Sequence, residues 1–348
     1  MDILQKIQAE LGPDEKKRAS ADQWTNVRAY DAYLEAKKGF KTFNADPTFE
    51  KWKSIYVHIQ KAIDIDSQYA DFYWFLSSWW LLGQGNNFIS AKEALAGAED
   101  AIEKGLALER DSAEMHIASA HLNQLKWDWE ASKREAKRAV ELAPGDPDAH
   151  NWYAVALFTL GFYDESIAEM KRAIREDPLF DNSGYQLGYC YFFARRHDEA
   201  IAILREGLQR TPNDNVAQSF LALSYAMKGM RAEASTEADK SLASLPTSEK
   251  GLYHLNIAVV YAQICRRKDA LSLLNECLAS RKGKPIDTYT IAEIYAAMGD
   301  KDEAFKWLEK TYQDRLSTMF QIKFDPLLDN IRSDPRFKDY LKKAGFEK

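Results

Sequence analysis

The residues of this chain that could bind a metal ion or transfer a proton include six histidines. Three of them, His116, His150 and His254, take equivalent places in the repeated pattern described below. His121 lies about one helical turn after the first of these, but no His-Glu-x-x-His pair or similar ligand spacing occurs. We therefore expect no metal site, and we expect the histidines to pack between helices.

Motifs for phosphate binding and nucleophilic catalysis are also missing. The sequence contains no GxxxxGKS, GxxxxGKT, GxGxxG or GxSxG motif. The segment 83–87 lacks both a lysine and a preceding strand. Paired acids such as Asp198 and Glu199 stand where helices are expected to begin, and the helix dipole explains them without catalysis. The sequence therefore predicts a chain that is not an enzyme and needs no cofactor.

Charge and cysteine content limit the classes of partner and compartment. The 348 residues carry 47 Lys and Arg against 53 Asp and Glu, and this net charge of -6 disfavours nucleic acid, whose binding needs a basic surface. Three cysteines without CxxC spacing indicate free thiols in a reducing compartment. The most apolar run, 72–83, is too short to span a bilayer, and the N-terminus does not resemble a signal peptide. We expect a cytoplasmic protein without a membrane segment.

The prolines reveal the elements that position these side chains. Successive members of one set are 34 residues apart, and a small residue stands twelve residues before each of them. Such a period is typical of repeat architectures built from helical hairpins. The prolines are Pro144, Pro178, Pro212 and Pro246, and the small residues are Ser132, Ser166, Ala200 and Ala234.

Within each unit the apolar residues recur at the helical spacing i, i+3, i+4 and i+7. Gly161 and Gly299 follow the first helix of their units, where the chain needs a left-handed residue, and acids begin the second helix. Asp-Pro or an equivalent pair then ends the second helix. Each unit is therefore predicted to be a helical hairpin.

The stretches GFYDESIAEMKRAIREDP and RRHDEAIAILREGLQRTP resemble the tetratricopeptide repeat family. This resemblance implies an all-α, right-handed superhelical solenoid of about eight hairpins with terminal capping helices. We expect an N-terminal connector or capping helix at 1–28, an array at 29–318, and a C-terminal capping helix at 319–348. The expected units are 29–69, 70–112, 113–146, 147–180, 181–214, 215–250, 251–284 and 285–318.

The first two units are irregular, because their ends imply nine extra residues. The simplest location for these residues is a loop at 83–87, before a capping box formed by Ser90 and Glu93. In the tail, Ser333 to Phe337 is expected to open a helix that covers the last hairpin, since a stacked array needs a terminal cap.

A narrower resemblance joins three stretches, NVRAYDAYLEAKKGF, LKWDWEASKREAKRAVELAPGDPDAHNWYAVAL and FDPLLDNIRSDPRFKDYLKKAGF. Together they look like the C-terminal tetratricopeptide regions of bacterial adenylate cyclases, winged-helix or TolB-like regulators and receptor kinases. This likeness implies an alternative function as the sensing module of a signalling enzyme or transcriptional regulator, excised from a longer chain or free-standing.

The first helix of each unit should also present a stripe of residues to the inside of the superhelix. This stripe is rich in aromatic residues, and a continuous apolar surface often marks a contact site. The alternative is that tight curvature buries Tyr185, Tyr189 and Phe192 against neighbouring units. A clamp for C-terminal carboxylates is disfavoured, because the stripe has one Asn and no Lys or Arg. The predicted groove residues are Trp74, His121, Asn151, Tyr185, Tyr189, Phe192, Tyr289 and Glu293.

These observations favour a non-catalytic scaffold or adaptor that binds a protein or peptide segment in its concave groove. Self-association through the aromatic segment 72–80 is a further alternative, which would give a homo-oligomer joined by its N-terminal units.

Overall fold

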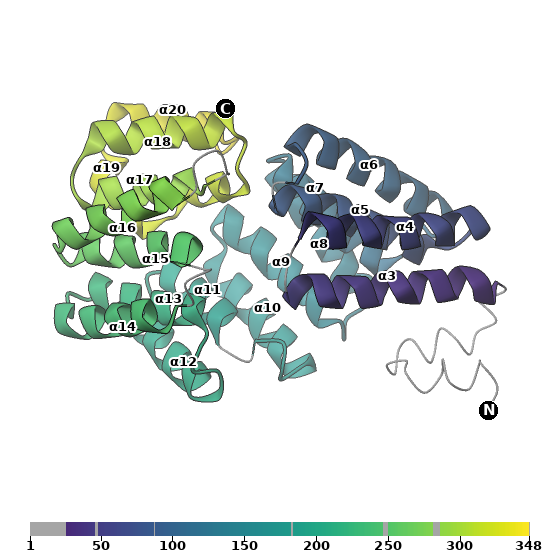
Figure 1. Ribbon diagram of the computed structural model, residues 1–348, viewed down its shortest axis with the longest axis horizontal. Helices are drawn as coiled ribbons and strands as arrows, with labels where there is room; N and C mark the ends of the chain where they lie inside the picture. The colour runs from purple at the N-terminus through teal and green to yellow at the C-terminus, as the bar shows by residue number, and fades with distance from the viewer. Residues whose placement is uncertain are drawn as a thin grey trace. The chain divides into compact units, whose positions relative to one another are not determined.

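The computed structural model describes residues 26–45, 48–86, 88–181, 184–245, 250–280 and 286–347. These ranges contain helices and turns, and no strand is found in them (Figure 1). The predicted connector helix at 1–28 lies outside the described residues, apart from 26–28. The chain divides into two compact units, with the boundary between Ala118 and Ser119 inside one helix.

The N-terminal unit consists of long helices that pair in chain order. Ser90 and Glu93 form the predicted capping box, in which the Glu93 N–H donates to Ser90 Oγ at 3.2 Å and the Ser90 N–H donates to Glu93 Oε2 at 3.0 Å. The prediction of this helix start is therefore confirmed. The pairs are α3 (Val27–Ala45) with α4 (Phe49–Ile65), and α5 (Ala70–Gly85) with α6 (Ala91–Leu108).

The expected loop at 83–87 is wrong for its first three residues, because α5 continues to Gly85. A Cβ atom on Gly83 would lie 2.6 Å from the Trp52 ring, so glycine is required where this indole packs directly on the helix backbone. Some of the extra residues of this unit therefore lengthen α5. The turn-forming residues at these positions had predicted a loop.

The C-terminal unit begins within α7 (Ala113–Leu125) and continues as antiparallel pairs joined by short turns (Figure 1). The pairing of consecutive helices confirms an all-α array of helical hairpins, while the total of eight hairpins stays a prediction. After α7 the helices are α8 (Trp129–Leu142), α9 (Pro147–Leu160), α10 (Tyr163–Glu176), α11 (Tyr185–Phe193), α12 (His197–Arg210), α13 (Asn215–Met227), α14 (Arg231–Ser244), α15 (Lys250–Gln263), α16 (Arg267–Ser280), α17 (Thr288–Ala297) and α18 (Lys301–Gln313).

The small residues of the repeat lie where the two helices of a hairpin come closest. The Ser132 hydroxyl donates to the Ala120 carbonyl at 2.9 Å, and the Ser166 hydroxyl donates to the Ala154 carbonyl at 2.7 Å. Both serines are buried, and both bonds join residues twelve positions apart. A larger side chain at either position would separate the helices and remove a buried hydrogen bond.

The turns inside the hairpins of the C-terminal unit use a left-handed residue, as the glycine pattern predicts. Gly161 and Gly299 have φ angles of +93° and +78°. Arg195 and Cys265 occupy the equivalent place with φ angles of +62° and +67°, although they carry side chains. Because this conformation is unfavourable for L-residues, the surrounding hairpin must hold these two residues in it.

The chain leaves the repeated pattern after α18. Tyr340, in the final helix, stacks on Phe305 of α18 with a centroid distance of 5.8 Å and donates its hydroxyl to the Phe305 carbonyl at 3.2 Å. The last helix therefore covers the last hairpin. Within the described residues, no helix combines the length and apolarity needed to cross a bilayer. The terminal elements are η1 (Ser317–Lys323), η2 (Pro326–Leu328), α19 (Asp329–Arg332) and α20 (Pro335–Lys343).

Candidate functional site

The first helices of the C-terminal hairpins bring predicted groove residues together. Tyr189 of α11 lies 5.8 Å from Phe158 of α9, 4.5 Å from Phe193 and 5.4 Å from Phe220 of α13, measured between ring centroids. Tyr185 packs on the same Phe220 ring at 5.6 Å. These rings form one aromatic wall across three helices. We call the surface formed by Phe158, Tyr185, Tyr189, Phe193, Phe220, Tyr289 and Glu293 the inner face.

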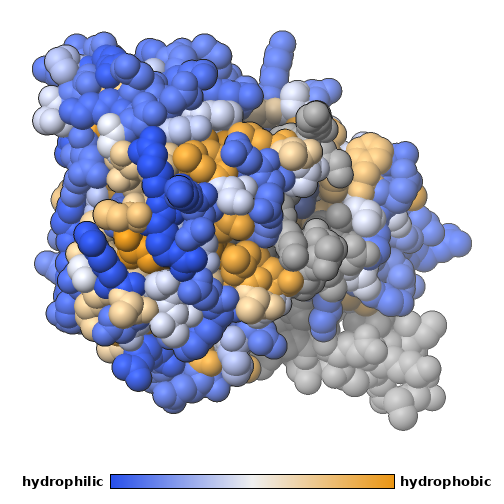
Figure 2. Space-filling model, turned by 60° about the vertical axis from the view of Figure 1, so that its left-hand side comes forward, coloured by the Kyte–Doolittle hydropathy of each residue, from blue (hydrophilic) through white to orange (hydrophobic). Residues whose placement is uncertain are grey.

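Part of the chain itself lies on this inner face. Phe324 meets Phe158 edge-on with centroids 4.7 Å apart and approaches Phe193 at 5.6 Å. Lys323 Nζ donates to the Leu160 carbonyl at 3.2 Å. We call residues 317–332, which comprise η1, η2 and α19, the docked segment. Apolar side chains appear as orange patches among hydrophilic ones on the face that Figure 2 displays.

The docked segment inserts an acid beside an acid of the inner face. The Tyr289 hydroxyl donates to Asp325 Oδ2 at 3.1 Å, and the Leu327 N–H donates to Asp325 Oδ1 at 2.8 Å. Glu293 is hydrogen-bonded to the same carboxyl group, and both acids are buried. Burial, followed by the charge of Asp325, raises the pKa of Glu293 well above its usual range. This pair therefore retains a proton at a pH where an exposed glutamate would be ionised.

Arginine side chains hold the rim of the docked segment. Arg195 makes a bidentate ion pair with Asp329 at 2.6 and 2.7 Å, which joins the α11–α12 turn to α19. Arg332 donates to the carbonyl oxygens of Lys323 at 2.9 Å and Asp325 at 2.8 Å. The segment is thus fixed by buried apolar side chains and by charged hydrogen bonds at its edge. The buried side chains are Phe324, Met319, Ile322, Leu328 and Ile331.

The end of the chain also reaches the first hairpin of this unit. Trp129 of α8 donates its indole N–H to the Ala344 carbonyl at 2.9 Å, and its ring stacks on Phe346 at 5.2 Å. Arg315 lies over the Trp127 ring at 4.7 Å. Residues that follow the last hairpin therefore connect the two ends of the C-terminal unit.

The predicted groove residues fall into separate environments. Phe192, Tyr289 and Glu293 are buried, with exposed fractions of 0%, 1% and 6%. His121 packs against Trp152 with ring centroids 4.4 Å apart, and burial lowers the pKa of His121 to about 4, so its ring is neutral at pH 7. Their role in binding a partner stays a prediction. The remaining predicted residues are Tyr185 and Tyr189 on the aromatic wall, Asn151, whose Oδ1 is buried without a hydrogen-bond partner, and Trp74, which is partly buried against the core of the N-terminal unit.

Sequence reasoning missed the residues that occupy the inner face. Phe324, Asp325 and Asp329 lie outside the repeat, so the 34-residue period gives no information about them. The one local signal is an acid between apolar residues in the stretch FDPLL, since an acid in such a run needs a buried partner if the run is buried. Arg195 carried a second signal, because it stands where neighbouring units have a left-handed glycine.

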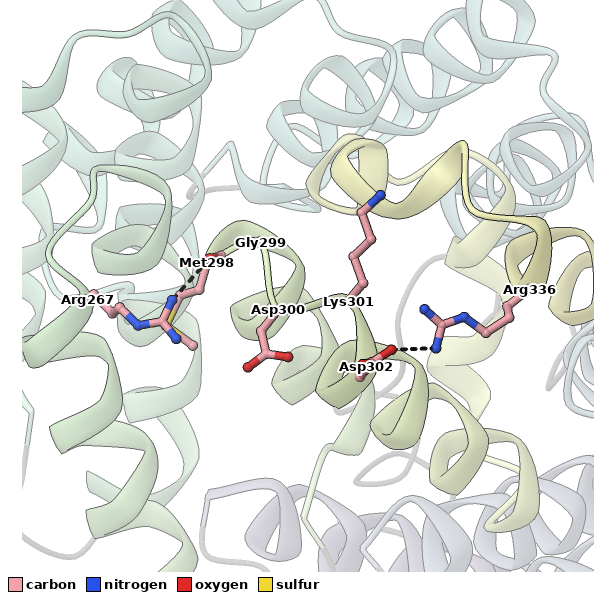
Figure 3. Close-up of a pocket in the computed structure, with 7 residues that line it drawn as sticks. All are labelled: Arg267, Met298, Gly299, Asp300, Lys301, Asp302 and Arg336. Carbon is pink, nitrogen blue, oxygen red and sulfur yellow. Dashed lines mark hydrogen bonds and ion pairs between the residues drawn. The ribbon is translucent and has the colours of Figure 1, made fainter.

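A polar concavity of about 510 Å³ lies at the turn between α17 and α18 (Figure 3). Arg267 donates to the Met298 carbonyl at 3.1 Å, and Arg336 pairs with Asp302 at 2.8 Å, so both guanidinium groups already have acceptors. This arrangement fits packing between turns better than recognition of an anion.

The N-terminal unit has its own aromatic pair. The Trp52 and Trp79 rings stack at 4.1 Å with an interplanar angle of 7°, and each indole N–H donates to the other residue's carbonyl, at 3.1 and 2.7 Å. A cavity of about 450 Å³ opens beside this pair and Tyr56. Phe72, from the segment predicted to self-associate, is buried in the same core, and self-association stays a prediction.

The histidines do not form a ligand cluster in the part of the chain that the structure describes. No group of three His, Cys, Asp or Glu residues there is arranged to hold a metal ion. His150 lies between Glu169 Oε2 at 2.6 Å and the Pro144 carbonyl at 2.9 Å. Its place in the repeat therefore serves packing between a helix and the preceding loop.

The paired helices, the buried small residues at their crossings and the left-handed turn position define a helical-hairpin repeat protein. Models of the tetratricopeptide repeat family match residues 117–179, 161–224 and 289–311. The chain therefore contains tetratricopeptide repeats, which confirms the broader of the two resemblances found in its sequence.

Two curated relatives match short parts of the chain. Small glutamine-rich tetratricopeptide repeat-containing protein 2 of Mycosarcoma maydis is 30% identical over 97 residues, which are 28% of this chain and 28% of that protein. Hsp70-Hsp90 organizing protein 2 of Arabidopsis thaliana is 28% identical over 81 residues, covering 23% of this chain and 14% of that protein. The matches span less than a third of each relative.

Solved structures share the fold over nearly the whole chain. A monomeric IFIT1 variant, solved with m7Gppp-AAAA, has a TM-score of 0.61 at 13% identity and covers 98% of this chain and 75% of its own. The Cut9-Hcn1 hetero-tetramer of APC/C has a TM-score of 0.54 at 17% identity, with coverages of 95% and 59%. At these identities the likeness concerns the fold alone.

Proposed function

We propose that this chain is a non-catalytic scaffold that binds a protein segment on the inner face of its C-terminal unit. The observation that carries this proposal is the position of Phe324, which packs against Phe158 and Phe193 from outside the repeats. A surface that accommodates one segment through an aromatic anchor and a charged rim has the features of a protein interface. Tetratricopeptide proteins act as interaction scaffolds, and the curated relatives carry the same repeats.

The chemistry of the inner face fits recognition better than catalysis. The carboxyl group of Glu293 and the Tyr289 hydroxyl both bond to Asp325 of the docked segment, and burial raises the pKa of Tyr289 well above its usual range. A general base or nucleophile would need a free path to a substrate and a pKa near the working pH. The likeness to adenylate cyclase and winged-helix regulators stays a prediction, because the matches above concern the repeats alone.

Site-specific photo-crosslinking tests this function in the full-length chain. A benzophenone amino acid replaces Tyr185 on the inner face in one variant and the exposed Arg205 on α12 in a matched control. Cells expressing either variant are irradiated, and crosslinked proteins are identified by mass spectrometry. We expect reproducible partner adducts at position 185 that are absent at position 205. Equal adduct patterns at both positions, or none at 185, would contradict the proposal.

A further inference from the structure

We propose that the docked segment, residues 317–332, is a displaceable internal ligand of the inner face. The partner that displaces it presents an aromatic residue followed directly by asparagine, in the places of Phe324 and Asp325. This proposal rests on the function proposed above and adds the chemical class of the partner segment.

The docked segment binds as a separate peptide would. Its elements are two short 3-10 turns and a four-residue helix, and they do not pair into a hairpin. Phe324 is buried among the rings of α9 and α11. Four aliphatic residues of the segment are buried in a core shared with α17, α18 and α20, namely Met319, Ile322, Leu328 and Ile331. Arg195 and Asp329 form the half-exposed rim. A buried apolar centre with polar contacts at its edge is the usual distribution of binding energy at an interface.

The acid at position 325 is a poor match to the surface it covers. Glu293 belongs to the inner face and Asp325 to the docked segment, so docking places two buried carboxyl groups in one hydrogen bond. Two carboxyl groups that share a hydrogen bond cannot both be ionised, so docking requires one of them to hold a proton. This requirement weakens docking at neutral pH, because Asp325 of the released segment and Glu293 of the uncovered inner face would both be ionised there.

The other groups around the pair do not remove this mismatch. Tyr289 of α17, Asp287, which caps the start of α17, and Tyr189 of α11 offer no positive charge to Glu293. Arg332 of α19 acts on Asp325 electrostatically, but its guanidinium donates to the backbone carbonyls of the docked segment and to Asp329. The inner face therefore presents an acceptor, Glu293, for which the docked segment supplies no permanent donor.

Asparagine at this position would remove the second acid and offer a permanent donor to Glu293. Its carbonyl oxygen can accept the backbone N–H that Asp325 now accepts from Leu327. Its two amide N–H groups can donate to the Glu293 carboxylate and to the Tyr289 hydroxyl oxygen. The side chain has the same shape as aspartate, so the aromatic anchor keeps its place beside Phe158.

Synthetic peptides covering residues 316–332 test this inference by fluorescence anisotropy at pH 7.5. One labelled peptide has the native sequence, a second carries Asp325→Asn, and a third carries both Asp325→Asn and Phe324→Ala. The receptors are the full-length chain with Asp329→Asn, an exposed change that loosens the rim, and the full-length chain with Phe324→Ala. Two receptors are used because Phe324→Ala removes a buried side chain from the core, whereas Asp329→Asn does not.

We expect the Asp325→Asn peptide to bind both receptors about tenfold more tightly than the native peptide, the scale of one hydrogen bond to a charged group. The peptide that lacks the phenylalanine should not bind. In a full-length chain that itself carries Asp325→Asn with Asp329→Asn, the internal segment should compete better and weaken peptide binding by a similar factor. Equal affinities for the native and Asp325→Asn peptides, or no binding by any peptide, would overturn the inference. If the peptide experiment fails but the partner crosslinks at position 185 persist, the proposed scaffold function stands and the inference about the docked segment does not.

Discussion

Replacing Arg195 by glycine separates the stability of the C-terminal unit from the docking of residues 317–332. Arg195 contributes in two opposite ways. Its backbone is held at a φ angle of +62°, which glycine adopts more readily, and its side chain forms the bidentate ion pair with Asp329. Arg195→Gly therefore relieves backbone strain and removes a rim contact in one step.

The two effects have similar sizes. A left-handed conformation costs an L-residue about 1–2 kcal/mol, and glycine loses roughly 0.5–1 kcal/mol more conformational entropy on folding, which leaves a net gain of about 0.5–1 kcal/mol. The ion pair is partly exposed, with side chains 49% and 40% accessible, so its contribution is about 0.2–1 kcal/mol. We expect the free energy of unfolding of Arg195→Gly to stay within about 1 kcal/mol of the parent chain.

Cys265→Gly is the matched control, because Cys265 is exposed and has the same backbone conformation, with a φ angle of +67°, in another hairpin. Urea denaturation should show a gain of about 0.5–1 kcal/mol for this control. Hydrogen exchange in residues 317–332 should be unchanged by Cys265→Gly and up to about fivefold faster in Arg195→Gly, as loss of the ion pair permits. Unchanged exchange in Arg195→Gly would refute the role of the rim, and a destabilised Cys265→Gly would refute the strain argument.

Two further predictions concern groups buried in the two units. Burial, followed by the charge of Asp325, raises the pKa of Glu293 when residues 317–332 are docked, so docking is stabilised below pH 4.5 and weakens as pH rises through the raised pKa. Hydrogen exchange of that segment, corrected for the intrinsic rate, should therefore accelerate with pH in the parent chain. The acceleration should be smaller with Asp325→Asn, which removes the second acid and leaves the burial of Glu293. Trp52→Phe removes the indole N–H that donates to the Trp79 carbonyl, and Trp79→Phe removes the reciprocal donor. Each change should lower the free energy of unfolding of the N-terminal unit by about 1–3 kcal/mol. If neither change lowers the melting temperature, the paired indole hydrogen bonds do not stabilise this unit.

The regular part of the fold could be predicted from the sequence because its contacts repeat locally. Ser132 and Ser166 each bond a carbonyl twelve residues earlier, within one hairpin, so the 34-residue period carries the contact with it. Gly161 and Gly299 could be assigned to left-handed turns for the same reason. The capping box at Ser90 depends on residues three positions apart. Each of these features is decided by neighbours along the chain.

The occupant of the inner face could not be predicted in this way. The Arg195 to Asp329 contact joins residues 134 positions apart, and the bond from Trp129 to the Ala344 carbonyl joins residues 215 positions apart. No periodic pattern relates a residue inside the array to one beyond it. Gly83 was misassigned for a similar reason, because the helix there accommodates the Trp52 ring from a preceding helix, while glycine alone suggested a loop.

Docking of residues 317–332 lowers the apparent affinity of a partner for the inner face. The internal segment is tethered to the face it covers, and a short tether gives an effective concentration in the millimolar range. If the docked form outnumbers the released form by about a hundredfold, the apparent affinity of any partner for the inner face falls by about the same factor. The mismatch between Asp325 and Glu293 limits this penalty, because it weakens the internal competitor and leaves the aromatic wall unchanged. Specificity of this face would then follow from which incoming segment avoids burying a second acid against Glu293.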